Sequence, residues 1–326
     1  MSKSLSPYVE KIANAIRENR RFLVATHVRP DGDAIGSVLG LTHMLRKLGK
    51  IADPFCEDPP PPGHDFLAGS GDIAHEPPPP ERYDAAVLVD CGEFNRVGSK
   101  LSESVRRGPF LINIDHHVSR VPFGDIDWVE PTASSTCEML YELSTGLPLD
   151  LDAQIATHLY TGLLADTGSF RFSNTTHRVL EIATRLVAAG AQPAYIAEQI
   201  YDSAPPQRLQ LLARVLSTVA FFQQDRLATA EMTRKMFAET STSPVDAEGF
   251  INHLRSVKTV EMAMLFREED NGTINVSMRS KGSVDVATFA QRFNGGGHRR
   301  AAAFRVPGLL AEVRSRLTNE ASSYLK

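Results

Sequence analysis

Residues 27–33 read His-Val-Arg-Pro-Asp-Gly-Asp, and they lie between a short apolar run at 21–26 and a segment with helical periodicity at 34–48. The apolar run predicts a buried strand, and apolar residues spaced three and four apart in the second segment predict an amphipathic helix. The histidine and the two aspartates should therefore lie on a loop at the carboxyl end of a strand, where open α/β sheets bind ligands. The alternative interpretation is structural: the second aspartate caps the helix, and the first lies near its positive end.

Other apolar segments end in ligand-type residues in the same way. Residues 85–90 and 110–115 read as buried strands that end in aspartate, and the second runs directly into two histidines. Residues 151–165 read as a helix that is followed by another aspartate. Strands that alternate with helices predict a parallel sheet covered by helices. If the strands are neighbours, six residues meet at one edge of this sheet: His27, Asp31, Asp33, Asp90, His116 and Asp166.

This set of side chains has the chemistry of a metal site. Four carboxylates held close together repel one another strongly at low dielectric, so they either bind protons or recruit cations. Two divalent ions would balance the four negative charges. Carboxylate oxygens with one or two imidazoles suit manganese or magnesium better than zinc, which favours thiolates. The sequence therefore predicts two divalent cations, with Mn²⁺ as the expected ion and Mg²⁺ or Co²⁺ as alternatives.

Composition restricts the class of protein. A length of 326 residues suggests about two domains, and 42% hydrophobic with 23% charged residues is typical of a globular protein. The formal net charge of −4 argues against a broad surface for duplex nucleic acid, although a short anionic substrate still fits a local basic pocket. No apolar run is long enough for a membrane span, and three widely spaced cysteines favour reduced thiols. We expect a cytoplasmic protein without a membrane partner.

The patterning divides the chain into three parts. Residues 1–190 carry the alternation of strands and helices and form the predicted catalytic domain, whereas residues 191–222 are almost wholly helical and form a predicted connector. Residues 223–326 predict a smaller α/β domain with a mixed sheet, because a hairpin signal at 270–273 (Asp-Asn-Gly-Thr) joins two of its strands. We expect the catalytic cleft to lie between the two domains.

Two features of the first domain are expected to have no chemical role. Two runs of four prolines, the first at 59–62, predict a stiff surface loop, and His64 and His75 beside them are assigned no partner. Asp125 and Asp127 flank a short apolar stretch and are expected to be solvated.

The last domain contains a local concentration of positive charge. Between residues 279 and 300 there is one acid, Asp285, against five basic side chains. The five are Arg279, Lys281, Arg292, Arg299 and Arg300. They accompany a glycine loop at 295–298 (Gly-Gly-Gly-His), whose backbone N–H groups can approach a phosphate. We expect Arg279 and His298 to contact an anionic ligand.

The motifs of the first domain carry a resemblance. The stretch at 27–33, then Asp90, then Asp115-His116-His117, then Asp166 resembles the four-motif series of the DHH phosphoesterases, a family named for that Asp-His-His. The order of the motifs along the chain is the same, and a combination of four such motifs is highly specific.

The last domain extends the resemblance over nearly the whole chain. Arg279-Ser280 after a strand and the glycine loop followed by alanines are similar to the DHH-associated C-terminal domain of the NrnA-type oligoribonucleases. Members of that type also act as phosphatases on 3′-phosphoadenosine 5′-phosphate. Two positions depart from the pattern, because Asn294 and Ala303 stand where glycine is usual. Both lie at the substrate loop, so they bear on substrate fit more than on chemistry.

The resemblance implies a role for each residue of the site. One ion would be held by His27, Asp31 and Asp90, and the other by Asp33, Asp90, His116 and Asp166. Paired ions of this kind activate water for in-line attack and stabilise the leaving oxygen. Asp115 would orient a neighbouring imidazole, and His117 would reach the substrate phosphate. The substrate would also be bound by Arg279, Ser280, Gly296, Gly297 and His298.

The implied function is metal-dependent hydrolysis of phosphoester bonds in very short oligoribonucleotides (nanoRNA) and in 3′-phosphoadenosine 5′-phosphate. The alternative is a phosphodiesterase that acts on a cyclic dinucleotide such as cyclic di-AMP, or on its linear product. A pyrophosphatase would need a more strongly cationic pocket, and a non-catalytic nucleotide sensor would not need an intact Asp-His-His. The expected partners are short RNA or nucleotide substrates, and a homodimer is compatible with the sequence.

Overall fold

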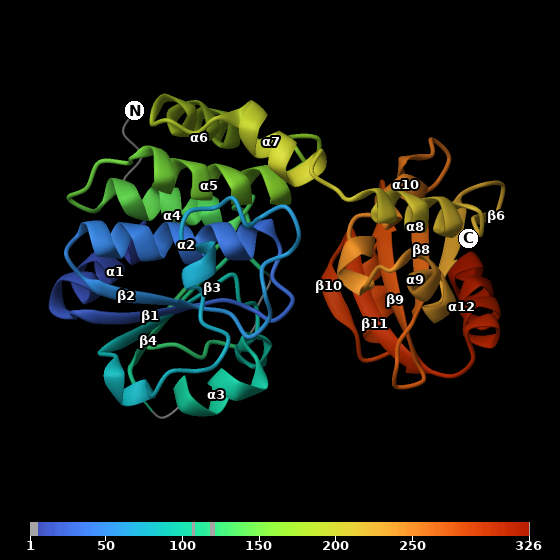
Figure 1. The fold of residues 1–326 in the computed structure, drawn as a ribbon, viewed down its shortest axis with the longest axis horizontal. Helices are drawn as coiled ribbons and strands as arrows, with labels where there is room; N and C mark the ends of the chain where they lie inside the picture. The colour runs from blue at the N-terminus through green and yellow to red at the C-terminus, as the bar shows by residue number, and fades with distance from the viewer. Residues whose placement is uncertain (1–5, 106–107, 118–120, 326) are drawn as a thin grey trace. The chain divides into compact units, whose positions relative to one another are not determined.

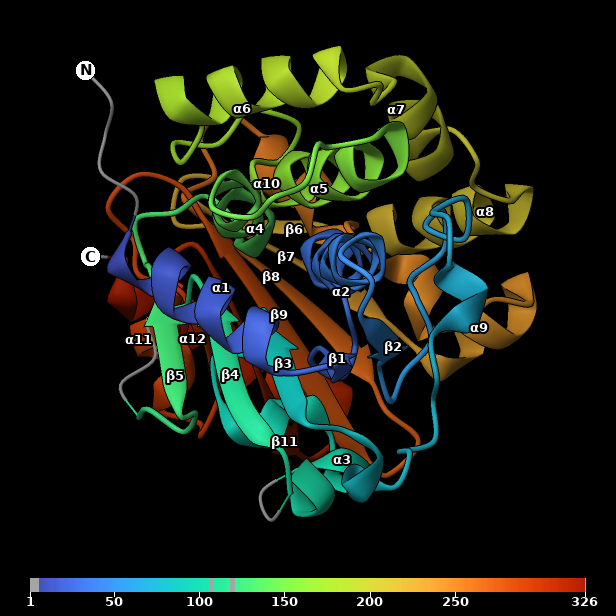
Figure 2. The same cartoon turned by 90° about the vertical axis from the view of Figure 1, so that its left-hand side faces the viewer.

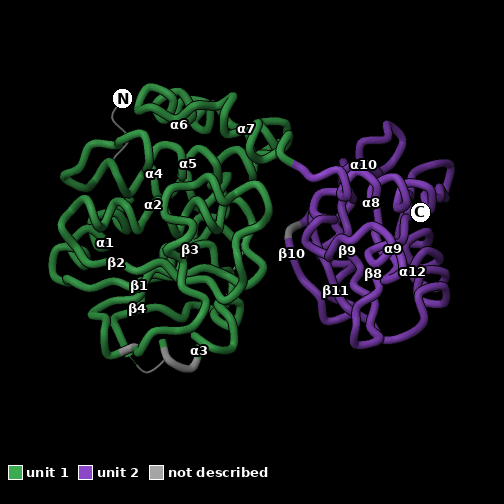
Figure 3. Tube along the Cα trace, viewed as in Figure 1, with its two compact units in different colours: residues 1–203 green, residues 204–326 purple. Residues whose placement is uncertain are grey.

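The structure of the chain, a computed structural model, describes residues 6–105, 108–117 and 121–325. The chain forms two compact units, residues 1–203 (unit 1) and residues 204–326 (unit 2), which are coloured separately in Figure 3. The segment predicted as a connector is divided between them, because helix α7 (Pro193–Tyr201) belongs to unit 1 and helix α8 (Pro206–Leu216) to unit 2.

Unit 1 is built on the parallel sheet that the sequence predicts. Its five strands lie in the order β2-β1-β3-β4-β5, and each neighbouring pair is parallel. Their bounds are β1 (Arg21–Ala25), β2 (Ile51–Phe55), β3 (Ala85–Val89), β4 (Phe110–Asp115) and β5 (Ile126–Val129). Because all strands run in the same direction, their carboxyl ends share one edge of the sheet. The predicted fold class of this part of the chain is confirmed.

Helices cover both faces of this sheet (Figure 1, Figure 2). They are α1 (Pro7–Glu18), α2 (Gly32–Lys47), α3 (Ser99–Val105), α4 (Thr136–Thr145), α5 (Ala153–Asp166), α6 (His177–Ala188) and α7. Successive side chains of a strand point to opposite faces, so Phe22 and Val24 of β1 pack with α1, α2 and α4, whereas Leu23 and Ala25 pack with α3. Helix α5 packs on α2, and α6 and α7 lie outside α5.

Two elements of unit 1 differ from the sequence prediction, which contained neither α3 nor β5. Asp125 and Asp127 were expected to be solvated; Asp125 is exposed and Asp127 is half-buried, and both also hydrogen-bond to β4 beside β5. Asp125 Oδ2 accepts a hydrogen bond from the N–H of Leu111 at 2.8 Å, and Asp127 Oδ1 accepts one from Asn113 Nδ2 at 3.1 Å. A strand of four residues is too short for its periodicity to be recognised in the sequence.

Unit 2 contains the expected mixed sheet. Its six strands lie in the order β10-β11-β9-β8-β7-β6, in which β7 and β8 are parallel and the other neighbours antiparallel. Their bounds are β6 (Ala220–Phe222), β7 (Leu227–Met232), β8 (Met262–Glu268), β9 (Thr273–Ser280), β10 (Gly296–His298) and β11 (Ala301–Pro307).

Both faces of this second sheet are covered as well. The helices of unit 2 are α8, α9 (Arg234–Thr240), α10 (Ile251–Ser256), α11 (Val286–Gln291) and α12 (Leu310–Tyr324). One core joins alternate residues of the strands, such as Met264 and Phe266, to α11 and α12. Another joins the intervening residues, such as Ala263 and Leu265, to α8 and α10.

The predicted glycine loop is an element of this sheet rather than a free loop. Residues 296–298 form the edge strand β10, in which Gly297 pairs with Ala302 of β11. Gly297 has a φ of +137°, and a Cβ at this position would lie 2.3 Å from the carbonyl oxygen of Ala301. Only glycine fits there, which explains a glycine within a strand.

None of the helices in the described part of the chain is both long enough and apolar enough to cross a membrane.

Candidate metal centre

The six predicted ligands meet at the carboxyl edge of the unit 1 sheet. His116, directly after β4, has its Nε2 atom 3.1 Å from Asp166 Oδ2, 3.5 Å from Asp90 Oδ1 and 3.9 Å from Asp33 Oδ2. His27, after β1, has its Nε2 atom 3.5 Å from the other carboxylate oxygen of Asp90. Loops after three parallel strands and the end of a helix thus supply one cluster.

Asp90 lies at the centre of this cluster. It follows β3 directly and has a φ of +59°, in the left-handed region that few non-glycine residues adopt. This backbone conformation, together with a hydrogen bond that Thr136 Oγ1 donates to its Oδ1 atom at 3.0 Å, fixes the carboxylate between His27 and His116. Both oxygens of Asp90 therefore face imidazoles, as expected of a bridging ligand.

Asp33 belongs to the first turn of helix α2, where it is fully buried and lies against the first turn of helix α4. Its two oxygens accept hydrogen bonds from the backbone N–H groups of Thr136, at 2.6 Å, and Cys137, at 3.0 Å. The positive end of the helix dipole thus compensates part of this negative charge. The approach is close, because a Cβ on Gly162 of α5 would lie 2.5 Å from Asp33 Oδ1.

The capping role considered from the sequence belongs to Asp31 instead of Asp33. Asp31 Oδ1 accepts hydrogen bonds from the N–H groups of Asp33 and Ala34, each at 3.0 Å, and so caps helix α2. The same side chain also offers an oxygen within 4.8 Å of ligand atoms of His27 and Asp90. Capping and ligand geometry are therefore both present, and the cap fixes the orientation of the carboxylate.

Backbone carbonyls orient the two predicted histidine ligands. His27 Nδ1 lies 2.9 Å from the carbonyl oxygen of Val28, and His116 Nδ1 lies 3.4 Å from that of Ala133. When these nitrogens carry the proton, each Nε2 presents a lone pair toward the carboxylates. This is the arrangement of metal-ligating histidines.

The third imidazole, His117, is held by the aspartate of the Asp-His-His. Asp115 Oδ1 lies 2.8 Å from His117 Nδ1, and Asp115 Oδ2 accepts the backbone N–H of the same residue at 3.1 Å. His117 is thus the imidazole that Asp115 orients. It also lies near the cluster, with Nδ1 3.6 Å from Asp90 Oδ1.

The crowding of charge shifts the protonation equilibria of the cluster. Burial and the charge of Asp90 raise the pKa of Asp33 well above its ordinary value, and burial raises the pKa of Asp166 to about 6. Burial also acts on Asp90, but the hydrogen bond from His27 and the charges of nearby histidines outweigh it and hold the pKa of Asp90 below its usual range. Although burial opposes it, the hydrogen bond with Asp166 raises the pKa of His116.

The donor set fits divalent cations. Among the described residues, three groups have ligand atoms within 4.8 Å of one another: His27, Asp31 and Asp90; Asp33, His116 and Asp166; and Asp90, His116 and His117. The first two groups correspond to the two predicted ion sites, apart from the bridging contribution of Asp90 to the second. The third shows that His117 is close enough to be a rival ligand.

Residues that support the cluster were not assigned a role from the sequence. Thr136 and Cys137 hold Asp33 and Asp90 through the first turn of α4, whose N-cap is Ser135. The sequence did contain a cap signal, the hydroxyl residues at 134–136 before a helical segment, but it indicated only a helix start.

In unit 2, strand register brings together the predicted substrate residues. Arg279 at the end of β9 pairs with Ala301 of β11, which in turn pairs with His298 of β10, although the side chain of His298 lies outside the described part of the chain. Ser280 is buried, and its hydroxyl donates to the carbonyl oxygen of Val284 at 2.8 Å, so it orders the turn after β9. Gly296 faces open space.

Three cations of the basic patch have structural partners. Arg292 forms an ion pair with Glu320 at 3.0 Å, Lys281 Nζ donates to the carbonyl oxygen of Val257 at 2.6 Å, and Arg299 donates to that of Ser283 at 3.0 Å. These interactions indicate that the three cations are solvated surface residues with partners in the protein rather than ligand-binding residues.

Comparisons with known proteins identify the family of this chain. A family profile described as "DHH family, N-terminal domain" matches residues 21–163, and one described as "DHHA1 domain" matches residues 225–326. The bifunctional oligoribonuclease and PAP phosphatase NrnA of Thermus thermophilus is 37% identical over 88% of this chain and 84% of its own length. The protein of the same name from Bacillus subtilis is 31% identical over 83% of this chain and 85% of its own length.

Solved structures show the same architecture. An exopolyphosphatase-related protein from Bacteroides fragilis has a TM-score of 0.91 and 26% identity, covering 99% of this chain and 98% of that protein. The exonuclease RecJ bound to manganese has a TM-score of 0.56 and 16% identity, covering 98% of this chain and 95% of that protein, which shows a shared fold alone.

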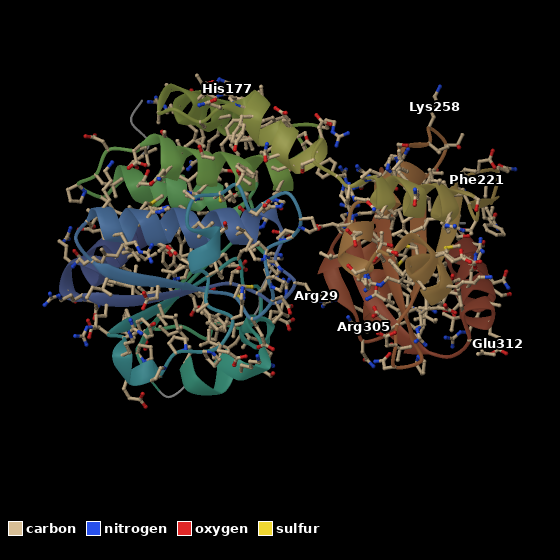
Figure 4. The ribbon with its side chains drawn as sticks, viewed as in Figure 1. Arg29, His177, Phe221, Lys258, Arg305 and Glu312 are labelled. Atoms are coloured by element: carbon tan, nitrogen blue, oxygen red, sulfur yellow. The ribbon has the colours of Figure 1, made fainter. Side chains whose placement is uncertain are left out.

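The two histidines of the Asp-His-His should differ in function. We expect His116→Ala to lose bound manganese, because His116 contacts three carboxylates, and His117→Ala to keep metal while turnover falls by about 10²–10⁴. Metal analysis and turnover of both variants check this, with His177→Ala on the exposed start of α6 as control (Figure 4). Equal metal loss in both variants would make His117 a ligand.

Metal stabilisation should depend on pH. Protons on Asp166, with a pKa of about 6, and on His116, with a raised pKa, must leave before a cation binds. A proton bound below these pKa values competes with metal, so the rise in Tm on adding Mn²⁺ to chelator-treated protein should be larger at pH 7.5 than at pH 5.5. Thermal unfolding at both pH values measures it. An equal rise at both would show that these groups do not bind the metal.

Proposed function

The chain belongs to the DHH family, and we propose that it hydrolyses phosphoester bonds in very short oligoribonucleotides and in 3′-phosphoadenosine 5′-phosphate. It is a hydrolase of phosphoester bonds, as members of this family are. One observation carries the substrate assignment: the chain is 37% identical, over most of its length, to a bifunctional oligoribonuclease and PAP phosphatase. The clustering of His27, Asp90 and His116 with the remaining ligands supports the same chemistry.

We propose that two divalent cations, expected to be Mn²⁺ with Mg²⁺ or Co²⁺ as alternatives, bind at this cluster. His27, Asp31 and Asp90 would hold one, and Asp33, Asp90, His116 and Asp166 the other. When bound, such ions lower the pKa of a water nucleophile and stabilise negative charge on the phosphate oxygens. The hard, oxygen-rich donor set supports this choice, since none of its members is a cysteine.

The protein's own contribution to the reaction is orientation. Asp115 accepts both the backbone N–H and the ring N–H of His117, so the ring has one orientation before the substrate arrives. We propose that His117 contacts the substrate phosphate and, when Nε2 is protonated as well, donates a hydrogen bond from Nε2 to its oxygens as charge develops there. An ordered donor of this kind needs no reorganisation during the reaction.

Unit 2 is proposed to bind the part of the substrate remote from the reacting phosphate. Arg279 and His298 lie in register across the strands of the sheet, next to the open backbone of Gly296. Gly297 and Ser280 shape the backbone around Arg279 and His298. Together these residues would bind a second phosphate or nucleotide. Charge-assisted hydrogen bonds from a guanidinium suit such an anionic group.

A parallel assay tests the proposed function. With Mn²⁺, the full-length protein should hydrolyse di- to pentaribonucleotides and release phosphate from 3′-phosphoadenosine 5′-phosphate, and excess chelator should abolish both activities. Cyclic di-AMP and its linear product are assayed alongside. A much higher kcat/KM on the cyclic substrate than on any ribonucleotide or on 3′-phosphoadenosine 5′-phosphate would replace the proposal by the cyclic-dinucleotide alternative.

Arg279→Ala should affect substrates unequally. If Arg279 binds a remote group, its loss lowers kcat/KM sharply on a dinucleotide but little on an aryl phosphodiester, which has no such group. The ratio of the two kcat/KM values is the measurement. Arg305→Ala, an exposed cation on β11 of the same unit (Figure 4), serves as control and should leave the ratio unchanged. Equal losses on both substrates would assign Arg279 to folding.

A further inference from the structure

His64 lies beside the metal cluster although the sequence placed it in a surface loop. It is only 7% exposed, and a Cβ on Gly32 would lie 2.9 Å from its Nε2 atom and 2.8 Å from the Cβ of Ala165. Gly32 separates Asp31 from Asp33, and Ala165 precedes Asp166. The ring therefore lies where the loop at residues 27–33 meets the end of helix α5.

The hydrogen bonding of the ring defines what Nε2 can do. Nδ1 lies 3.2 Å from the carbonyl oxygen of Pro62, which can accept but cannot donate, so Nδ1 carries the proton of the neutral ring. A histidine is mainly neutral above its ordinary pKa of about 6.5, and burial lowers the pKa of His64 further. Nε2 is then an acceptor, and no group in the described part of the chain donates a hydrogen bond to it.

Two partners are unsuitable for this nitrogen. A phosphate oxygen without a proton cannot donate a hydrogen bond to it. Nor is His64 placed as a metal ligand, because the three groups of ligand atoms within 4.8 Å that the described residues form do not include it. Nε2 is not among the described side-chain atoms that are fully buried without a partner, so a ligand can reach it, and a hydroxyl or amino group is the ligand group that can donate to it.

We propose that Nε2 of His64 accepts a hydrogen bond from the ribose 2′-hydroxyl of the substrate and thereby selects ribonucleotides over deoxyribonucleotides. This role rests on the proposed function. His64 is a specificity residue here: it takes part in no proton transfer and holds no metal.

The chemistry of the two proposed substrates supports this choice of donor. In an oligoribonucleotide, the phosphodiester is attached to a 3′ oxygen whose neighbouring carbon carries the 2′-hydroxyl. In 3′-phosphoadenosine 5′-phosphate, the reacting phosphate is attached to the same 3′ position with the same neighbouring hydroxyl. One acceptor placed beside the reacting phosphate would therefore serve both substrates, and the 2′-hydroxyl is the group by which proteins distinguish RNA from DNA.

The test measures the ratio of kcat/KM for a diribonucleotide to that for its 2′-deoxy counterpart, with full-length, Mn²⁺-loaded protein. The parent protein should prefer the ribonucleotide. In H64F this ratio should fall by about tenfold, which corresponds to the loss of one neutral hydrogen bond. H64Q, whose amide oxygen can replace Nε2 as acceptor, should retain part of it. H75F is the matched control, since His75 lies in the same segment and its Nδ1 lies 2.8 Å from the carbonyl oxygen of Cys56.

A substrate analogue provides a test that does not depend on the folding of any variant. A 2′-fluoro dinucleotide keeps the size and electronegativity of the hydroxyl but cannot donate, so the parent protein should disfavour it as strongly as the deoxy substrate. Equal kcat/KM for the 2′-fluoro and ribonucleotide substrates would overturn the role of His64, as would an unchanged ratio in folded H64F. Absence of any ribonucleotide or 3′-phosphoadenosine 5′-phosphate hydrolysis by the parent protein would instead overturn the proposed function, and the role of His64 with it.

Discussion

Electrostatic repulsion among four buried or half-buried carboxylates is the constraint on which this site depends. Asp33 and Asp90 are almost inaccessible to solvent, so water cannot screen their charges. Neighbouring polar groups compensate part of this negative charge. The first turn of α4 donates its N–H groups to Asp33, and two imidazoles face Asp90. The remaining negative charge explains why a cation would bind here and why several groups have shifted pKa values.

Helix geometry is adapted to this crowding. Gly162 has no side chain where α5 passes the carboxylate of Asp33 and the thiol of Cys137, and any larger residue would displace one of them. The positions of the carboxylates are therefore set by close packing between α2, α4 and α5 as well as by the strand ends. Orientation of the ligands before a cation arrives reduces the reorganisation that binding requires.

The sequence was sufficient to predict site residues where a possible ligand directly follows an apolar segment with clear periodicity. Asp90 and His116 follow strongly apolar strands, so their meeting at one edge could be predicted from a parallel sheet. It was insufficient for His64, because residues 56–84 contain proline runs and little periodicity, and only the packed structure shows which way the ring faces. Gly297 illustrates a third case: a glycine triplet predicts a loop, whereas here close backbone approach requires glycine inside a strand.

Each of the two units has hydrophobic cores of its own, formed by interleaved strand residues and their covering helices. This has an evolutionary consequence. Selection can alter the side chains on β9 and β10 of unit 2 without disturbing the packing that holds the carboxylates of unit 1. Descendants of one ancestral gene can therefore acquire new substrates while they inherit the hydrolytic chemistry unchanged.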